Sequence, residues 1–201
     1  HSGGIDVTRQ VAWRMLKSEG GGTLQDLGTH IIDLIDYLAG PIESVFAEKR
    51  VLHPERPGPD GRSVPIEVDD QTVVLARLSG GAIGVIEATK IASGAEDEMR
   101  FEIHGDLGAM RFNLMDMNYL EVCDLRETDE PHGGQRGWRK IASVQRYGNP
   151  SVLPGPKFGI GWLRGHVHCL FSFLAAVAEN RQGEPSLQRG LRLQRILSAA
   201  E

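Results

Sequence analysis

The chain has 201 residues, of which 40% are hydrophobic and 24% are charged, and its formal net charge is −5. This composition is typical of a globular domain and argues against a wholly disordered chain. The small acidic excess argues against a nucleic-acid-binding domain, because such domains carry a basic surplus or a basic stripe.

The sequence gives no sign of a disulfide framework or of a membrane anchor. Its two cysteines, Cys123 and Cys169, form no CxxC pair, which is typical of a reducing compartment. The longest run of small apolar residues, 170–178, is about half of what would span a bilayer. No basic segment followed by an apolar one opens the sequence. We therefore expect a cytoplasmic protein that contacts neither membranes nor nucleic acid.

The first predicted element is a helix over residues 23–39. It follows the loop of residues 18–22 and ends at Gly40 and Pro41, which is a normal helix end. At about 100° per residue, its larger apolar side chains collect on one side, which is expected to face the core. These side chains are Leu24, Leu27, Ile31, Leu34, Ile35 and Leu38.

Alternating, β-branched segments predict a series of strands through the middle of the chain. They are residues 43–52, 68–78, 82–91, 99–104, 109–114 and 119–125. Turn signals at 79–81 and 105–108 join neighbouring segments into hairpins, so the sheet is expected to be antiparallel. The Pro- and Gly-rich residues 53–65 predict a surface loop.

The remainder of the chain completes an α+β pattern. Residues 126–161 predict a long polar loop with a short strand near 140–146, and helices are expected at 163–180 and 186–200. Helices at both ends with strands between them predict one open, mostly antiparallel sheet with helices packed on one face. Because no internal linker is evident, we expect residues 1–201 to form a single domain.

One face of the first helix carries the strongest candidate for a functional site. Asp26, His30, Asp33 and Tyr37 follow one another at spacings of 4, 3 and 4 residues, which places them within about a quarter-turn of each other. A carboxylate one turn from a histidine can orient the imidazole and favour its protonated form. Such a pair can hold a hydroxyl and exchange its proton. The alternative is an ordinary solvated face, which any surface helix shows.

A metal site is a second possibility, because His166 and His168 could join Asp26 and His30. Two histidines separated by one residue on a helix diverge by about 200°, so they cannot bind one ion there. An extended segment could bring them together if the helix began later. We expect no bound metal, and a metal-dependent hydrolase remains the alternative class.

A glycine-rich stretch from Gly159 to Gly165 looks like a dinucleotide fingerprint at the start of a helix. Pro154 and Pro156 precede it in place of a buried strand, and no strand follows the helix to close a βαβ unit. We expect no nucleotide to bind at this stretch.

Several motifs resemble the glucose–fructose oxidoreductase, inositol dehydrogenase and MocA family (Gfo/Idh/MocA). The most specific is the glycine-rich block that holds the Asp-x-Gly-x-His pattern at Asp26, Gly28 and His30. The other matching segments are 13–14, 68–71, 79–84, 103–109, 173–174, 183–185 and 190–200. They cover nearly the whole chain and are similar to the C-terminal domain of that family.

The resemblance implies a two-domain oxidoreductase of which this chain is one domain. Family members have an N-terminal Rossmann domain that binds NAD or NADP and carries a catalytic lysine in a Glu-Lys-Pro segment. Their C-terminal open-sheet domain binds a sugar, a cyclitol or a related polyol and builds the oligomer. The sequence lacks the first domain, so we expect a fragment or excised domain that is inactive alone and forms a homo-oligomer through its open sheet.

The resemblance also assigns roles to individual residues. His30 matches the family histidine that takes or passes the hydroxyl proton, and Asp26 matches the carboxylate that hydrogen-bonds the substrate or positions that histidine. Arg14, Asp33 and His166 are expected to contribute to substrate binding. The competing interpretation is a non-catalytic sugar-binding or oligomerisation module, in which the Asp26 and His30 row is only surface.

Overall fold

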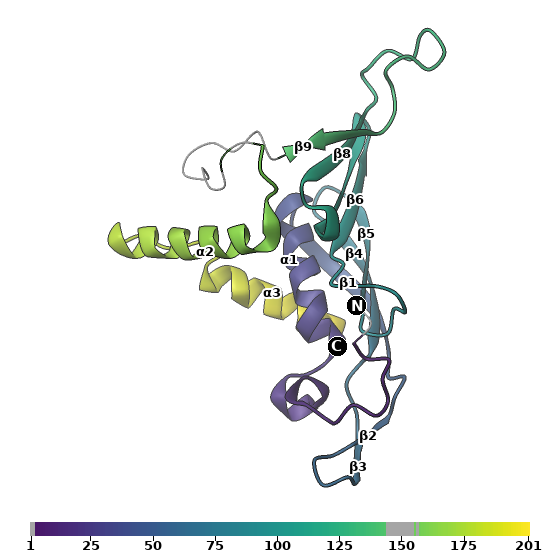
Figure 1. Ribbon diagram of the computed structural model, residues 1–201, viewed down its shortest axis with the longest axis vertical. Helices are drawn as coiled ribbons and strands as arrows, with labels where there is room; N and C mark the ends of the chain where they lie inside the picture. The colour runs from purple at the N-terminus through teal and green to yellow at the C-terminus, as the bar shows by residue number, and fades with distance from the viewer. Residues whose placement is uncertain (1–2, 144–154, 156) are drawn as a thin grey trace. The chain divides into compact units, whose positions relative to one another are not determined.

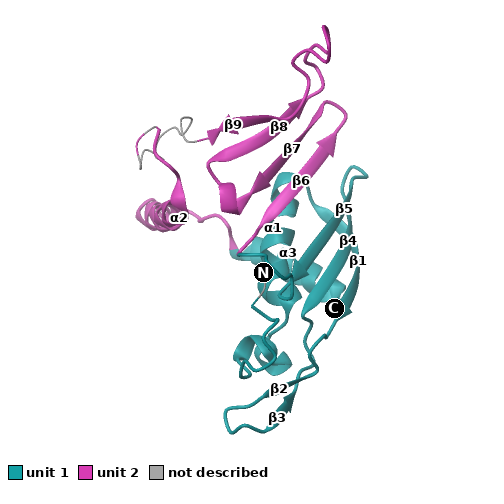
Figure 2. Cartoon of the chain, turned by 45° about the vertical axis from the view of Figure 1, so that its right-hand side comes forward, with its two compact units in different colours: residues 1–96, 187–201 teal, residues 97–186 magenta. Residues whose placement is uncertain are grey.

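The structure, a computed structural model, describes residues 3–143, 155 and 157–201 and divides into two compact units. Unit 1 contains residues 1–96 and 187–201, and unit 2 contains residues 97–186 (Figure 2). In the sequence, unit 2 is therefore an insertion into unit 1.

Unit 1 is built on a three-stranded antiparallel sheet in the order β1-β4-β5. The strands are β1 (Ile42–Arg50), β4 (Gln71–Leu78) and β5 (Ile83–Thr89). In β4, every second residue from Thr72 to Leu78 is buried, and the residues between them are exposed. The sheet thus has one covered face and one open face, as strand alternation predicts.

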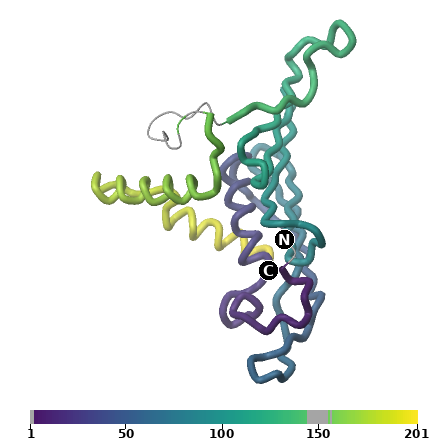
Figure 3. The backbone as a smooth tube through the Cα atoms, in the orientation of Figure 1, coloured from purple at the N-terminus to yellow at the C-terminus, as the bar shows by residue number. Residues whose placement is uncertain are grey.

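Helices from opposite ends of the chain cover the buried face. The π-helical turn Leu24–Gly28 runs directly into α1 (Thr29–Leu38), and α3 (Leu187–Ala200) packs beside it (Figures 1 and 3). The core contains apolar side chains from the helices and all three strands. Its buried members are Leu24, Ile32, Ile42, Val74, Ala76, Leu78, Ile86, Ile196, Leu197 and Ala200.

The π-helical turn changes which residues of the first helix face the sheet. The predicted apolar face included Leu38, but Leu38 is 45% exposed, whereas Ile32, absent from that face, is fully buried. A π turn takes more residues than an α turn. Its presence at Leu24–Gly28 therefore rotates the following helix relative to a uniform 100° winding, so that Leu24, Gly28 and Ile32 are the buried positions.

The predicted loop at 53–65 contains a short hairpin, which corrects the expectation of an irregular loop. Strands β2 (Glu55–Pro57) and β3 (Ser63–Pro65) pair antiparallel. Arg56, only 3% exposed, donates hydrogen bonds from its guanidinium to the carbonyls of Gly4 and Asp6. These long-range contacts fix a segment whose proline content alone indicated a loop.

Unit 2 contains a second antiparallel sheet, in the order β6-β7-β8-β9. Its strands are β6 (Arg100–Gly105), β7 (Gly108–Asn113), β8 (Tyr119–Asp124) and β9 (Arg139–Ala142). The helix α2 (Gly161–Ala178) follows. The end of the strand predicted near 140–146 lies outside the described residues.

Single 3-10 turns occur in both units, at Trp13–Met15 and Lys17–Glu19 in unit 1 and at Leu114–Asp116 in unit 2.

The predicted α+β class with antiparallel strands is confirmed, but the strands form separate sheets rather than one. Residue alternation places the strands, whereas lateral pairing depends on contacts that the pattern does not encode. Here β5 pairs with β4 and β6 pairs with β7. Within the described ranges, none of the helices combines the length and apolar character needed to cross a bilayer.

Candidate active site around Asp26

The start of the first helix is fixed by a carboxylate from a distant segment. Asp69, which precedes β4, accepts hydrogen bonds from the backbone N–H groups of Thr23 (3.2 Å) and Leu24 (2.9 Å). The Thr23 hydroxyl donates to the Asp69 carbonyl at 2.8 Å, and the Thr72 hydroxyl donates to the Asp69 carboxylate. Asp69 thus satisfies N–H groups that a helix start leaves without partners.

Three consecutive glycines bring Arg14 close to this helix start. The N–H groups of Gly21 and Gly22 donate to the carbonyls of Leu16 (2.9 Å) and Arg14 (3.0 Å). A Cβ atom on Gly21 would lie 2.5 Å from the Arg14 carbonyl oxygen, so only glycine allows this close approach. Gly20 adopts φ 72°, the left-handed conformation that glycine tolerates best.

Asp26 lies inside the π-helical turn and is held by two cations. The Nζ of Lys90 is 2.8 Å from Oδ2 of Asp26, and the Nε of Arg14 is 3.2 Å from the same oxygen. Lys90 directly follows β5, and Arg14 belongs to the 3-10 turn Trp13–Met15. Three segments that are distant in sequence therefore meet at one carboxylate. π turns occur frequently at functional sites.

The electrostatic balance at Asp26 favours its ionised form. Partial burial acts to raise the pKa of this carboxyl, but the hydrogen bond and charge of Lys90, together with Arg14, outweigh it and lower the pKa below its usual value. Asp26 is therefore a carboxylate at neutral pH and can act as a hydrogen-bond acceptor.

His30 lies in the first turn of α1, one helical turn after Asp26, and its side chain is exposed. Across the described residues, the ion-pair partners of Asp26 are Arg14 and Lys90 rather than His30. The exposed imidazole is accessible to a ligand. The catalytic roles predicted for His30 and Asp26 stay predictions.

Comparison with known proteins identifies the family. The family model of the GFO/IDH/MocA C-terminal domain matches residues 2–111, more than half of the chain. The chain belongs to the GFO/IDH/MocA family. This confirms the resemblance that the Asp-x-Gly-x-His block indicated.

Two dehydrogenases are among its relatives in this family. Levoglucosan dehydrogenase of Pseudarthrobacter phenanthrenivorans is 32% identical, over 92% of this chain and 50% of that protein. Myo-inositol 2-dehydrogenase of Thermotoga maritima is 37% identical over 44% of this chain and 25% of that protein. The chain thus spans about half the length of the first of these relatives.

Solved structures of similar proteins have the same fold. The structure of levoglucosan dehydrogenase in complex with NADH and L-sorbose is 30% identical, with a TM-score of 0.87 over 99% of this chain and 52% of that one. An oxidoreductase domain protein from Kribbella flavida is 34% identical, with a TM-score of 0.86 over 96% of this chain and 51% of that one.

Asp33, unlike Asp26, forms its ion pair with a residue of α3. The Nε of Arg189 on α3 lies 2.6 Å from Oδ1 of Asp33, and the guanidinium also donates to the Asp33 carbonyl at 2.8 Å. The same guanidinium lies 5.2 Å from the centre of the Tyr37 ring. Thus the later half of the predicted polar row is in contact with α3, and the substrate role of Asp33 stays a prediction.

His166 lies on α2 in unit 2, where its ring makes an edge-to-face contact with Trp162 at 5.1 Å. On the same helix, the Nε of Arg164 lies 3.5 Å from Nε2 of His168. Over the described part of the chain, three His, Cys, Asp or Glu side chains do not gather in any place that could hold a metal ion. The role predicted for His166 in substrate binding stays a prediction.

Sequence reasoning missed Lys90 as a member of this site. It stands at the end of a predicted strand, where a lone lysine is typical of a solvent-exposed strand terminus. No spacing relates it to Asp26, because the two residues meet only when β5 packs against the π turn. The signal available in the sequence was weak: an ionisable residue directly after an apolar, half-buried strand.

Proposed function

We propose that this chain is the substrate-binding domain of an NAD(P)-dependent oxidoreductase that acts on a sugar, a cyclitol or a related polyol by hydride transfer. The observation that carries the proposal is the Asp26 carboxylate, ion-paired with Lys90 and Arg14, one helical turn from the exposed His30. A carboxylate acceptor beside an imidazole suits a hydroxyl that must be held and deprotonated.

The cofactor is proposed to bind mainly to a part of the parent protein that this chain does not include. The structure of levoglucosan dehydrogenase, a relative of this chain, was solved in complex with NADH. In the chain as described, every strand pairing is antiparallel, so these residues do not form the βαβ unit that cradles a dinucleotide. When bound, NAD(P) would supply the hydride acceptor, and this chain would bind and orient the substrate hydroxyl.

The proposed roles are Asp26 as the hydroxyl acceptor and His30 as the proton acceptor. Arg14, 53% exposed at its side chain, is proposed to meet the substrate as well. Asp33 and His166 are proposed as further substrate contacts. The isolated 201-residue chain is proposed to lack dehydrogenase activity, and the parent protein to work in the cytoplasm.

The test measures turnover by the full-length protein that contains this chain, with NAD⁺ and NADP⁺ as alternative cofactors and levoglucosan and myo-inositol as probe substrates. His30→Ala is expected to lower kcat by about 10²- to 10⁴-fold, the usual contribution of a general base. His104→Gln, at an exposed histidine of β6, is the matched control and should retain turnover. Near-native kcat in His30→Ala would refute the role of His30. Sugar binding without turnover would favour a non-catalytic module.

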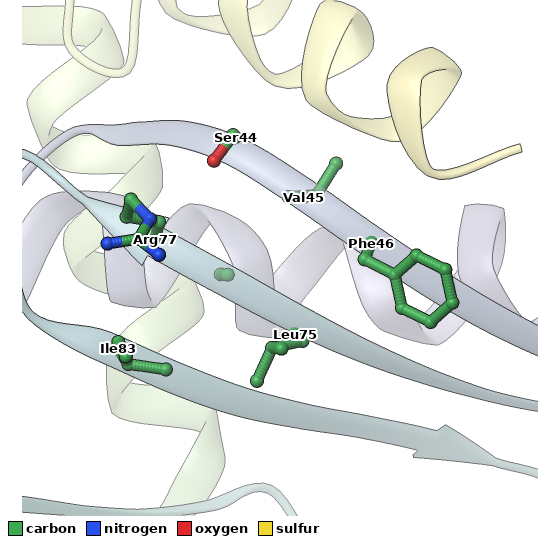
Figure 4. Close-up of a pocket in the computed structure, with 7 residues that line it drawn as sticks. Ser44, Val45, Phe46, Leu75, Arg77 and Ile83 are labelled. Atoms are coloured by element: carbon green, nitrogen blue, oxygen red, sulfur yellow. The ribbon is translucent and has the colours of Figure 1, made fainter.

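We also propose that the open face of the unit 1 sheet joins copies of this chain into a homo-oligomer. Phe46, Leu75 and Val85 are cross-strand neighbours on this face and are 69%, 48% and 71% exposed. A shallow hollow of about 220 Å³ lies among Phe46, Leu75, Arg77 and Ile83 (Figure 4). Contiguous exposed apolar surface of this kind marks interaction sites. A second copy is the proposed occupant, because an antiparallel apolar ladder is suited to self-complementary pairing.

A further inference from the structure

The two cations on Asp26 are held in different ways. Lys90 has its backbone fixed on both sides, because its N–H donates to the Asp70 carbonyl at 3.0 Å and its own carbonyl accepts from the Gly4 N–H at 2.7 Å. Its side chain is only 18% exposed. The ammonium of Lys90 is thus delivered to Asp26 from a fixed strand end, along a mostly buried aliphatic stem.

Arg14 is the more accessible cation. Its side chain is 53% exposed, and its guanidinium also lies 4.4 Å from the centre of the exposed Trp13 ring. A long, exposed side chain gains little from an ion pair, because solvent screens the charge and the ordered geometry costs side-chain entropy. Lys90 is therefore the cation that sets the position of the Asp26 carboxylate.

The carboxylate keeps the capacity to bind a ligand. An ionised carboxyl offers about four lone-pair sites on its two oxygens. The shortest contacts of Lys90 and Arg14 are both to Oδ2 of Asp26. Acceptor sites are therefore left for a hydroxyl donor.

We propose that Lys90 is a positioning residue for the reaction: it fixes the Asp26 carboxylate as a hydrogen-bond acceptor for a substrate hydroxyl, so that the hydroxyl proton passes to His30 rather than to Asp26. The inference rests on the proposed function and adds a residue that the family motif does not contain. Lys90 itself does not contact the substrate.

The first test observes the carboxylate directly, without substrate or cofactor. The 201-residue chain is labelled with ¹³C at the aspartate carboxyl, and the Asp26 signal is identified by its loss in Asp26→Asn. In Lys90→Met, burial of Asp26 persists while its closest cation is gone, so its titration midpoint is expected to move upward. Lys90→Arg should restore a low midpoint, and Lys49→Met, at an exposed lysine of β1, should leave it unchanged.

An unchanged Asp26 titration in folded Lys90→Met would overturn the inference, whatever the protein's function is. If Lys90→Met does not fold, Lys90→Gln is measured in the same way, because it retains a polar tip without the charge. An unchanged midpoint in Lys90→Gln would likewise overturn the inference.

The second test uses the full-length protein with levoglucosan and myo-inositol as probes. Lys90→Met is expected to lower kcat/KM by about 10- to 100-fold, by analogy with the loss seen when a hydrogen-bond partner that orients a metal ligand is removed. The acidic limb of its pH profile should move upward, and Lys90→Arg should recover most of the activity. A purely structural role would lower stability without moving that limb, and this result would refute the inference. If the titration responds as expected but neither probe is turned over, the proposed function fails while the contact from Lys90 to Asp26 stands.

Discussion

Arg192 of α3 binds Asp36 of α1, and this ion pair ties the end of the chain to its beginning. The guanidinium donates to Oδ1 of Asp36 at 2.8 Å and to the Ile42 carbonyl at 2.9 Å. The Ile42 N–H donates in turn to Asp36 at 2.9 Å. One carboxylate therefore joins α1, α3 and the first residue of β1.

Arg192→Met should destabilise unit 1. The side chain of Asp36 is only 11% exposed, so the variant leaves a mostly buried carboxylate with a single backbone donor. The expected loss in unfolding free energy is about 1–3 kcal/mol, the cost of a buried group that loses its partner. Urea denaturation measures it. Arg195→Met, an exposed arginine on the same helix, is the control and should change stability little.

Asp36 should also make stability depend on pH in the acid range. Burial acts to raise the pKa of its carboxyl, but Arg192 and the Ile42 N–H outweigh it, so the pKa in the folded chain lies below the usual 3.8. The stabilisation is complete above the unfolded pKa and is lost as the pH falls through the lower folded pKa. Asp36→Asn should flatten the slope of unfolding free energy against pH in this window. An equal slope in both proteins would contradict the prediction.

Gly21→Ala should disturb the candidate site as well as the fold. Its Cβ would lie 2.5 Å from the Arg14 carbonyl oxygen and 2.8 Å from that of Leu16, both backbone atoms that can yield only by moving the loop. We expect a loss of about 2 kcal/mol or more and a changed Asp26 titration, because Arg14 moves. Gly20→Asn is the control: a Cβ atom there meets nothing within 4 Å, and asparagine tolerates its φ of 72°. Equal stability of the two variants would refute this account.

Leu75→Glu should weaken self-association of the chain. Leu75 lies at the centre of the open sheet face, 48% exposed, so a charge there costs the folded monomer little but opposes burial against a second copy. Light scattering coupled to size-exclusion chromatography should show a smaller species than the unsubstituted chain. Glu67→Lys, at an exposed position outside the three sheet strands, is the control. A chain that is already monomeric without substitution would rule out the proposed interface.

The local pattern of apolar and turn residues was sufficient to predict the positions of most helices and strands. The helix expected at 23–39 is observed to Leu38, and the alternation at 82–91 corresponds to β5 at Ile83–Thr89. These elements follow from side-chain period and from turn residues, which are properties of neighbouring positions.

Long-range contacts account for what the sequence could not predict. The π turn, the separate sheets and the hairpin within 53–65 depend on which segments meet in space. The candidate site shows the same division. Spacing predicted Asp26 and His30 as candidates, whereas Lys90 is 64 positions after Asp26 and reaches it only through strand packing.

The insertion of residues 97–186 into unit 1 also constrains the order of folding during synthesis. Ile196, Leu197 and Ala200 are buried in the core of unit 1, yet they are translated after all of unit 2. Until α3 leaves the ribosome, the sheet β1-β4-β5 lacks part of its apolar cover. Unit 2 can condense in the nascent chain first, while unit 1 waits for its closing helix and exposes surface to chaperones in the interval.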